Sequence, residues 1–192
     1  PLANLLSAPG LGAVNPCCKL FIAPNAALAP VMPNLLAAIK TVERLPATIA
    51  LVAIGRKTKY YQELLDYIQT HKLQNKVHFF ENIAFDDLPG IYQLAQALIY
   101  PSRFEGFGIP IIEALNSRIP VIAAIGSCLE EAGGPHSLYA AADDIDSFVK
   151  HCTEILYNEQ QRKKMIEGGY NYVQRFESKT VATQLIKLYQ NL

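Results

Sequence analysis

Two carboxylates and two glycines lie close together in the middle of the chain. Glu105 begins the segment Glu-Gly-Phe-Gly, and Glu113 follows eight positions later. Gly106 and Gly108 have no side chain, so a ligand can come close to the backbone of this segment. A carboxylate cannot bind a phosphate but accepts hydrogen bonds from hydroxyls. These residue types therefore indicate backbone contacts to an anion, with carboxylates beside it that receive sugar hydroxyls.

The flanking sequence predicts a strand before this loop and a helix after it. The apolar run 97–100 ends at Pro101, which is typical of the exit of a buried strand, and Pro110 lies where a first helical turn accepts proline. A loop that leads into a helix presents free N–H groups and the positive end of the helix dipole. The alternative is that Glu113 only stabilises the helix start and Glu105 is a solvated loop residue.

Strand and helix patterns alternate along the chain. Predicted strands cover 20–23, 48–54, 77–80, 97–100 and 121–124. Predicted helices cover 33–44, 60–71, a segment starting at Asp86 or Asp87, the segment after Pro110, a short stretch near Leu129, a segment from Asp143 or Asp144 to 157, 159–175 and 178–190. One aspartate of each pair, Asp86 or Asp87 and Asp143 or Asp144, is expected to cap the N-terminus of the helix that it begins. This order predicts an α/β fold with a doubly wound parallel sheet, Rossmann-like, and a ligand at the carboxyl ends of its strands.

Composition narrows the classes of partner. A chain of 192 residues suits one domain, and its net charge of zero gives no bulk attraction to nucleic acid or an acidic membrane. The uncharged run 20–39 is broken by prolines and asparagines, so it is not predicted to span a membrane. The four cysteines and four histidines show no metal-ligand spacing. Reduced thiols favour a cytoplasmic location, and contact with a membrane surface stays open.

The pattern of residues 97–115 resembles the E-x7-E signature of retaining glycosyltransferases of the GT-B fold, the family 4-like or group 1 transferases. That family includes bacterial mannosyl- and glucosyltransferases of surface polysaccharides. The resemblance extends from about Thr48 to the C-terminus and includes 119–123 and 129–134. It implies the donor-binding, C-terminal half of a GT-B fold. Glu131 and Gly134 match a glutamate and a glycine of the family, although a helix-to-strand turn is the favoured interpretation there.

The resemblance implies a role for each residue of the loop. Glu105 is the catalytic candidate and would contact hydroxyls of the donor sugar, while Glu113 would hold the ribose hydroxyls. Backbone N–H groups of Gly106, Phe107 and Gly108 would meet the sugar and the distal phosphate. The implied reaction transfers a hexose from a UDP-, GDP- or ADP-linked donor to a saccharide or lipid-linked acceptor, with no metal and no cofactor beyond this donor.

The nucleotide base and the diphosphate are expected nearer the start of the domain. Ile83 falls where family members seat the base against the backbone. The family's basic diphosphate loop corresponds to residues 23–32, which contain no basic residue. Loss of a charge-assisted hydrogen bond costs ~1.5–3 kcal/mol. Either this loop is impaired, or Arg56 and Lys57 supply the charge, or its alanines are not the natural side chains; a solvated, basic helix start is the alternative for Arg56 and Lys57.

The domain boundaries follow from the same comparison. Residues 1–18 are linker-like or a truncated opening, 19–175 form the nucleotide-sugar-binding domain, and 176–192 form a helix expected to pack on an N-terminal acceptor domain of the same protein. Two other functions stay open. One is a non-catalytic nucleotide-sugar-binding module or partner subunit. The other is an epimerase or phosphorylase of the same fold, which would carry other signatures around the sugar.

Overall fold

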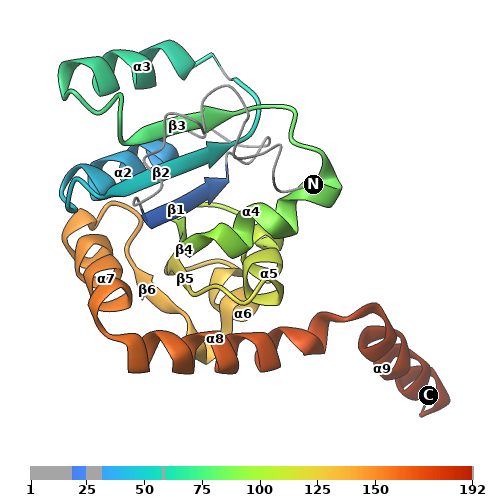
Figure 1. Cartoon of the computed structure of the whole chain (residues 1–192). Coiled ribbons are helices and arrows are strands. Elements are labelled where there is room, and N and C mark those ends of the chain that lie inside the picture. The colour runs from blue at the N-terminus through green and yellow to red at the C-terminus, as the bar shows by residue number, and fades with distance from the viewer. Residues whose placement is uncertain (1–18, 25–31, 58, 192) are drawn as a thin grey trace.

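The computed structural model describes residues 19–24, 32–57 and 59–191. They form a six-stranded sheet with helices on both faces (Figure 1). The strands are β1 Lys19–Pro24, β2 Ile49–Ile54, β3 Val77–Phe80, β4 Ala95–Tyr100, β5 Val121–Ala124 and β6 Leu138–Ala140. The helices are α2 Met32–Glu43, α3 Tyr61–Thr70, α4 Leu88–Leu94, α5 Ile109–Asn116, α6 Leu129–Gly133, α7 Ile145–Tyr157, α8 Glu159–Val173 and α9 Ser178–Gln190. Three single 3₁₀ turns are η2 Phe85–Asp87, η3 Gly134–His136 and η4 Gln174–Phe176.

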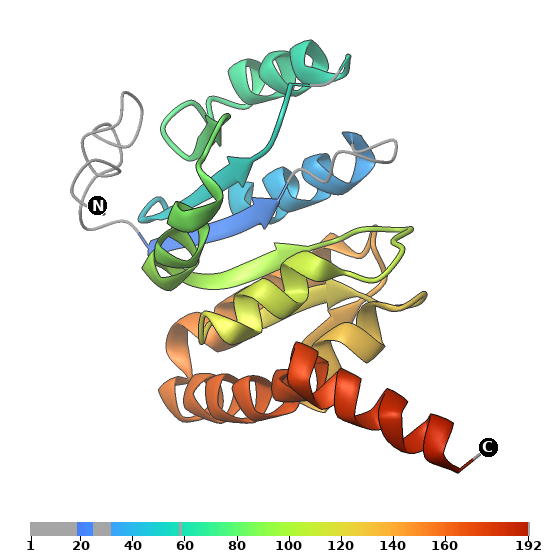
Figure 2. The same cartoon turned by 90° about the vertical axis from the view of Figure 1, so that its right-hand side faces the viewer.

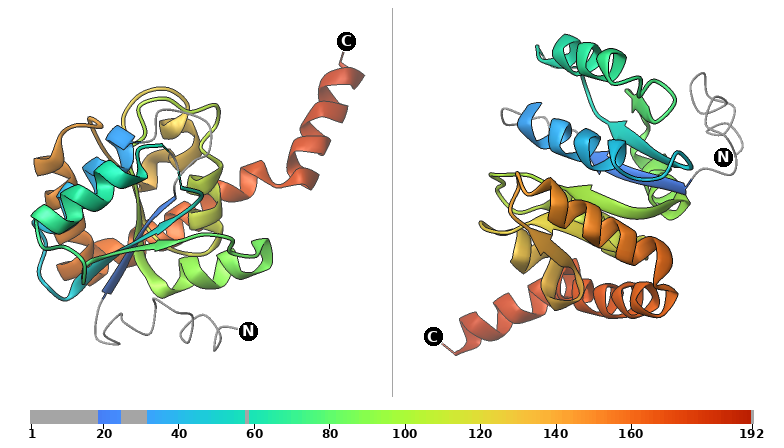
Figure 3. Two further views of the ribbon diagram at one scale, coloured as in Figure 1. Left: turned by 90° about the horizontal axis from the view of Figure 1, so that it is seen from above. Right: turned by 90° about the vertical axis from the view of Figure 1, so that its left-hand side faces the viewer.

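All neighbouring strands are parallel, in the order β3-β2-β1-β4-β5-β6. The chain therefore builds outward from β1 to β3, returns to the middle at β4, and builds outward again to β6. Helices α4, α5 and α6 cover one face (Figure 2), and α2, α3 and α7 cover the other (Figure 3). This is the predicted doubly wound sheet. Its order reverses between β1 and β4, and the carboxyl ends of these two strands are where such sheets bind ligands.

Strand β2 is apolar throughout because it packs on helices at both faces. Leu51 and Ala53 of β2 belong to the core cluster beneath α2, α3 and α7. Val52, between them, belongs to the second cluster, beneath α4, α5 and α6. Side chains of a strand alternate between faces, so burial on both sides requires an uninterrupted apolar run.

Helix α8 connects the two clusters, and α9 leaves the body of the domain. Met165 of α8 packs in the first cluster and Val173 in the second. Gly169 lets α8 approach α5 closely, because a Cβ at this position would lie 2.6 Å from the Leu115 side chain. Helix α9 projects from the domain in every view (Figures 1, 2 and 3), and none of its described residues is buried.

The structure corrects two expectations and selects between two residues. Strand β6 was not predicted, because it has only three residues and only Ala140 is buried. Asp87 precedes α4 but accepts no capping hydrogen bond from the described residues, because η2 already has helical backbone geometry there. Asp144 caps α7 by accepting a hydrogen bond from the Ser147 N–H, at 3.0 Å. The turn predicted around Gly134 is present as η3, between α6 and β6.

Two expectations concern residues that the structure does not describe. The linker-like opening 1–18 and residues 25–31, within the loop where the family has its basic residues, lie outside the described residues. None of the described helices is both long and apolar enough to cross a bilayer.

Candidate functional site

The Glu-Gly-Phe-Gly loop connects β4 to α5 at the switch point of the sheet. Gly108 occupies the N-cap position of α5 with a left-handed backbone, at φ +88°. A Cβ at this position would lie 3.2 Å from Leu129 and 3.3 Å from Ala132, both in α6. A side chain here would therefore strain the backbone and push the loop away from α6. Around Gly106, by contrast, a Cβ would meet no atom within 4 Å.

Glu105 is held by hydrogen bonds to both its side chain and its backbone. The Ser102 hydroxyl donates to Oε1 of Glu105 at 2.8 Å, and Nδ2 of Asn34 in α2 donates to the Ser102 oxygen at 3.2 Å. Ser102 is only 3% exposed, so water does not compete well for these bonds. The Glu105 carbonyl accepts from the Ser127 hydroxyl at 3.1 Å and from the Cys128 thiol at 3.4 Å. The loop after β5 therefore fixes the loop after β4.

A buried phenol lies beside Glu105. The Tyr100 hydroxyl, at the end of β4, is buried and has no hydrogen-bond partner within the described part of the chain. Burial raises the pKa of Tyr100, and the nearby Glu105 carboxylate raises it further. The hydroxyl therefore stays protonated and is available as a donor at the base of the loop.

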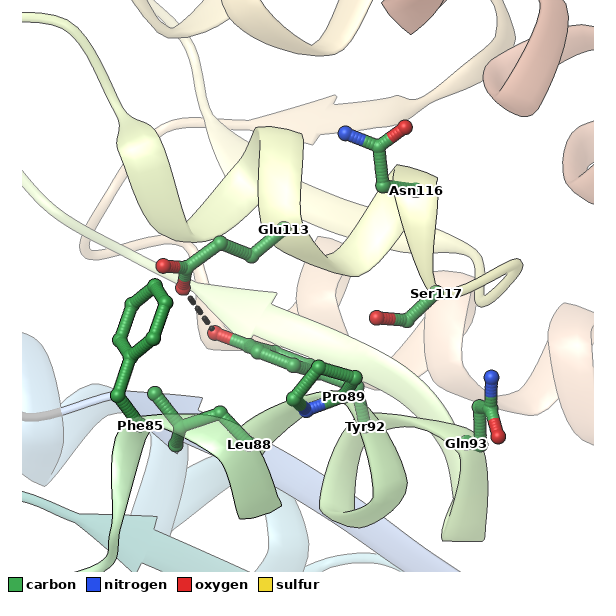
Figure 4. A pocket seen from close by; sticks show the side chains of 8 residues that line it. All are labelled: Phe85, Leu88, Pro89, Tyr92, Gln93, Glu113, Asn116 and Ser117. Carbon is green, nitrogen blue, oxygen red and sulfur yellow. Dashed lines mark hydrogen bonds between the residues drawn. The ribbon is translucent and has the colours of Figure 1, made fainter.

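Glu113 is oriented from α4, across a pocket (Figure 4). The Tyr92 hydroxyl donates to Oε2 of Glu113 at 3.0 Å, and the second carboxylate oxygen points away from Tyr92. Tyr92 is 4% exposed. Burial, and then the Glu113 carboxylate, raise its pKa, so the phenol remains a donor. This bond occupies one oxygen of Glu113 and leaves the other turned outward.

The pocket between α4 and α5 has a volume of about 250 Å³. Its lining is Phe85, Leu88, Pro89, Tyr92, Gln93, Glu113, Asn116 and Ser117. Phe85 forms part of its wall yet is 78% exposed, so its ring is available to a ligand. An apolar wall with a few polar groups is typical of small-molecule sites. Here the Phe85 ring supplies apolar surface and Glu113 supplies acceptor oxygens.

Arg56 and Lys57 lie at the carboxyl end of β2, in a second group of candidate residues. The Lys57 ammonium pairs with Glu81 at 3.1 Å, and the Lys57 N–H donates to the same carboxylate at 2.9 Å. The hydrogen bonds to Lys57 lower the pKa of Glu81, and the bond to Glu81 raises the pKa of Lys57. These contacts join the loops after β2 and β3, and Ile83, two residues beyond Glu81, packs against the second core cluster.

The structure thus divides the predicted residues into two groups. Glu105, Gly106, Phe107, Gly108 and Glu113 follow β4, whereas Arg56, Lys57 and Ile83 follow β2 and β3. Strand β1 separates β2 from β4 in the sheet. In the described part of the chain, no group of three or more His, Cys, Asp or Glu side chains is arranged to hold a metal ion.

Sequence reasoning missed the residues that hold the two carboxylates. Asn34 and Ser102 are 68 positions apart, and Tyr92 and Glu113 are 21 apart. Tyr92 has the helical spacing of a core residue, and in the sequence nothing marks its hydroxyl as a partner of Glu113. The one available signal was Ser102, which follows Pro101 directly at the start of the loop.

The fold and the loop define a Rossmann-like domain with a candidate site at the switch point of its sheet. The family model of glycosyl transferases group 1 matches residues 32–191, and the chain belongs to this family.

Among curated proteins, the chain is 34% identical over 127 residues to the O-antigen chain mannosyltransferase RfbU of Salmonella typhimurium, covering 66% of this chain and 35% of that protein. It is 33% identical over 107 residues to O-antigen chain mannosyltransferase B of Escherichia coli, covering 56% of this chain and 28% of that protein. The chain therefore matches about a third of the length of each relative.

Solved structures share the fold. Anabaena HepE, solved in complex with UDP and glucose, aligns with a TM-score of 0.84 at 20% identity, over 100% of this chain and 52% of that one. A glycosyltransferase from Rickettsia africae aligns with a TM-score of 0.82 at 19% identity, over 99% of this chain and 51% of that one. The predicted fold, a doubly wound Rossmann-like sheet that is one half of a GT-B fold, is confirmed.

Proposed function

We propose that the chain is the donor-binding half of a retaining glycosyltransferase. The whole enzyme transfers a hexose from a nucleotide sugar to a hydroxyl of a saccharide or lipid-linked acceptor during synthesis of a surface polysaccharide. The observation that carries this proposal is the pair of oriented carboxylates, Glu105 held by Ser102 and Glu113 held by Tyr92, on either side of the glycine loop. The family and the mannosyltransferase relatives support it.

The donor is placed by matching its chemistry to the two carboxylates. Ribose hydroxyls donate to the outward oxygen of Glu113, and the base lies near Phe85 and the backbone of Ile83, at the pocket between α4 and α5. The hexose hydroxyls donate to Glu105. The diphosphate lies between the two carboxylates, at the loop and the N-terminus of α5, where N–H groups and the helix dipole favour negative charge.

The proposed site favours departure of the diphosphate. Positive charge develops on the sugar while the leaving group takes negative charge, and fixed donors aimed at that charge stabilise the transition state. The backbone N–H groups of Gly106, Phe107 and Gly108 are the proposed donors. Arg56 and Lys57 supply cations if Lys57 exchanges Glu81 for a phosphate. The proposal invokes no metal and no further cofactor.

The acceptor is proposed to bind on an N-terminal domain of the same protein. The chain matches 52% of HepE and about a third of each curated relative. Helix α9 carries the exposed apolar side chains of Val181, Leu185, Leu188 and Tyr189. A helix of 13 residues is marginal in water without packing. We propose that this apolar face packs on the N-terminal domain.

Titration calorimetry tests the donor site. The 192-residue chain is titrated with UDP, GDP and ADP, and then with the corresponding nucleosides. We expect one nucleoside diphosphate to bind more tightly than the other two and more tightly than its own nucleoside. Failure of all three to bind would contradict the proposal. A retaining mechanism is tested separately, by the anomeric configuration of the product that the full-length protein makes.

A non-catalytic binding module is the second candidate function. The observation that favours it is the absence of any basic residue from positions 23–32 of the sequence. A module of this kind binds the nucleoside diphosphate, but the full-length protein then neither transfers nor hydrolyses the sugar. An assay of the full-length protein with labelled donors separates the two functions.

A further inference from the structure

The aromatic ring of the glycine loop packs on the segment that leads into α9. Phe107 meets Phe176 of η4 edge to face, with ring centroids 5.4 Å apart and an interplanar angle of 87°. Phe107 is 39% exposed, so this contact covers only part of its ring. Phe107 is also the only residue with a side chain between Gly106 and Gly108, and it is therefore the side chain through which this part of the loop can be held.

Phe176 is itself held from α8. The ring centroids of Phe176 and Tyr172 are 6.1 Å apart, with an interplanar angle of 73°. The Arg175 guanidinium lies 5.7 Å from the centroid of the Phe176 ring and 5.1 Å from that of the Tyr172 ring. The Tyr172 hydroxyl donates to the Glu131 carbonyl at 2.7 Å. Phe176 also packs against the second core cluster. The Phe176 ring that contacts Phe107 is therefore held in place by its own neighbours.

Phe176 is also two residues from the start of α9. Glu177 between them is extended, at φ −61° and ψ 140°, so the helical course of the chain is interrupted there. Because α9 has no buried residue of its own, its direction is set at this junction. One aromatic residue thus contacts the loop on one side and adjoins the unpacked helix on the other.

We propose that Phe176 is a positioning residue for the Glu105–Gly108 loop. Through the Phe107 ring it holds the backbone N–H groups of this loop. This inference rests on the proposed function, in which these N–H groups donate hydrogen bonds to the distal phosphate and the sugar of the nucleotide sugar. Phe176 does not touch the donor itself.

The test compares ligands that do and do not reach the loop. In the 192-residue chain, Phe176→Ala should weaken binding of the preferred nucleoside diphosphate by about three- to tenfold, the range expected for loss of one edge-to-face aromatic pair. Binding of the corresponding nucleoside should not change, because the nucleoside does not reach the loop. Phe176→Tyr keeps the ring and should restore the affinity.

A control separates positioning from general destabilisation. Val173 is buried in the core cluster against which Phe176 packs, but the ring that contacts Phe107 belongs to Phe176. Val173→Ala should lower the thermal midpoint and leave the ratio of the two affinities unchanged. If Val173→Ala changes that ratio as much as Phe176→Ala does, or if Phe176→Ala weakens both ligands alike, the inference is wrong.

A fluorescence measurement tests the contact without any ligand. The chain contains no tryptophan, so Phe176→Trp introduces a single reporter. Its emission should shift when Phe107→Ala is added, because the ring that covers it is removed. An unchanged emission overturns the contact.

The binding results separate this inference from the proposed function. If the wild-type chain binds no nucleotide, the proposed function fails. If it binds and Phe176→Ala has no effect, this inference alone fails.

Discussion

Tyr92 and Glu113 join α4 to α5 through one hydrogen bond of 3.0 Å, at the wall of the pocket between these helices. The bond fixes which carboxylate oxygen faces outward (Figure 4). A donor bond to a charged acceptor is stronger than one between neutral groups. The orientation of Glu113 is therefore part of the fold, and a ligand does not have to impose it.

The first prediction concerns this carboxylate. Glu113→Gln keeps an oxygen that accepts from Tyr92, so the domain should stay folded. Binding of nucleoside and nucleoside diphosphate should both weaken by ~1–3 kcal/mol, because the ribose is common to both ligands. Calorimetry measures the two affinities, and Glu63→Gln, on α3, is the control carboxylate. Equal affinities in wild type and Glu113→Gln would reduce Glu113 to a residue that stabilises the helix start.

The second prediction concerns the pH dependence of stability. The folded-state pKa of Tyr92 is raised above its ordinary value of 10, first by burial and then by Glu113. Between pH 10 and the raised pKa, this tyrosine loses its proton in the unfolded chain but keeps it in the folded chain. The free energy of unfolding should therefore fall as pH rises above about 10, by up to ~1.4 kcal/mol per pH unit for one such group.

Urea unfolding at pH 8, 9.5 and 10.5 measures this slope. Tyr92→Phe removes the titrating group, so its stability should fall less steeply than that of the wild type over the same range. Tyr157→Phe, at an exposed position, is the control and should keep the wild-type slope. The explanation is wrong if Tyr92→Phe also keeps that slope.

The third prediction concerns the hydrogen bonds that hold Glu105. Ser102→Ala removes the donor to Glu105 and the acceptor for Asn34 together. We expect the nucleotide sugar to bind no more tightly than the nucleoside diphosphate alone, because the carboxylate that receives the sugar hydroxyls is no longer oriented. Affinity for the diphosphate should change little. Thr153→Ala removes a comparable hydroxyl bond on α7 and should leave both affinities unchanged. Equal loss for both ligands in Ser102→Ala would assign Ser102 to loop folding only.

The fourth prediction concerns the cations after β2. The double variant Arg56→Ala with Lys57→Ala should weaken nucleoside diphosphate binding far more than nucleoside binding, because only the former carries phosphates. Stability should change little, since exposed ion pairs contribute little to folding. Lys163→Ala breaks a comparable exposed pair with Glu159 on α8 and serves as the control. If both ligands weaken alike, or neither does, the cations do not serve a diphosphate.

The sequence predicted the sheet because strands buried on both faces must be apolar throughout. Val121 to Ala124 is an example, with all four residues buried. It also predicted the glycine loop, since Gly108 is required there by both its backbone conformation and its contact with α6. Strand β6 was missed because three residues, of which only Ala140 is buried, give no periodic signal. Asn34 and Tyr92 were missed because they come from other elements of the fold, α2 and α4.

The last prediction concerns the 192-residue chain by itself. Glycosyl transfer needs an acceptor held in line with the donor, and orientation accounts for a large share of the reduction in the barrier. The residues after β4 supply the proposed donor side, and the apolar face of α9 is unpacked in the described structure. We therefore expect this chain to bind a nucleotide but to transfer no sugar to any acceptor.

Slow hydrolysis of the donor is compatible with this view, because water needs no acceptor site. The measurement incubates the chain with a panel of radiolabelled nucleotide sugars and a mixture of oligosaccharide and lipid acceptors. A matched incubation with Glu105→Gln shows whether any hydrolysis depends on the site. Acceptor-dependent product from this chain alone would falsify the half-enzyme proposal. Such a product would require the chain to complete its own site, for example by pairing two copies through the exposed face of α9.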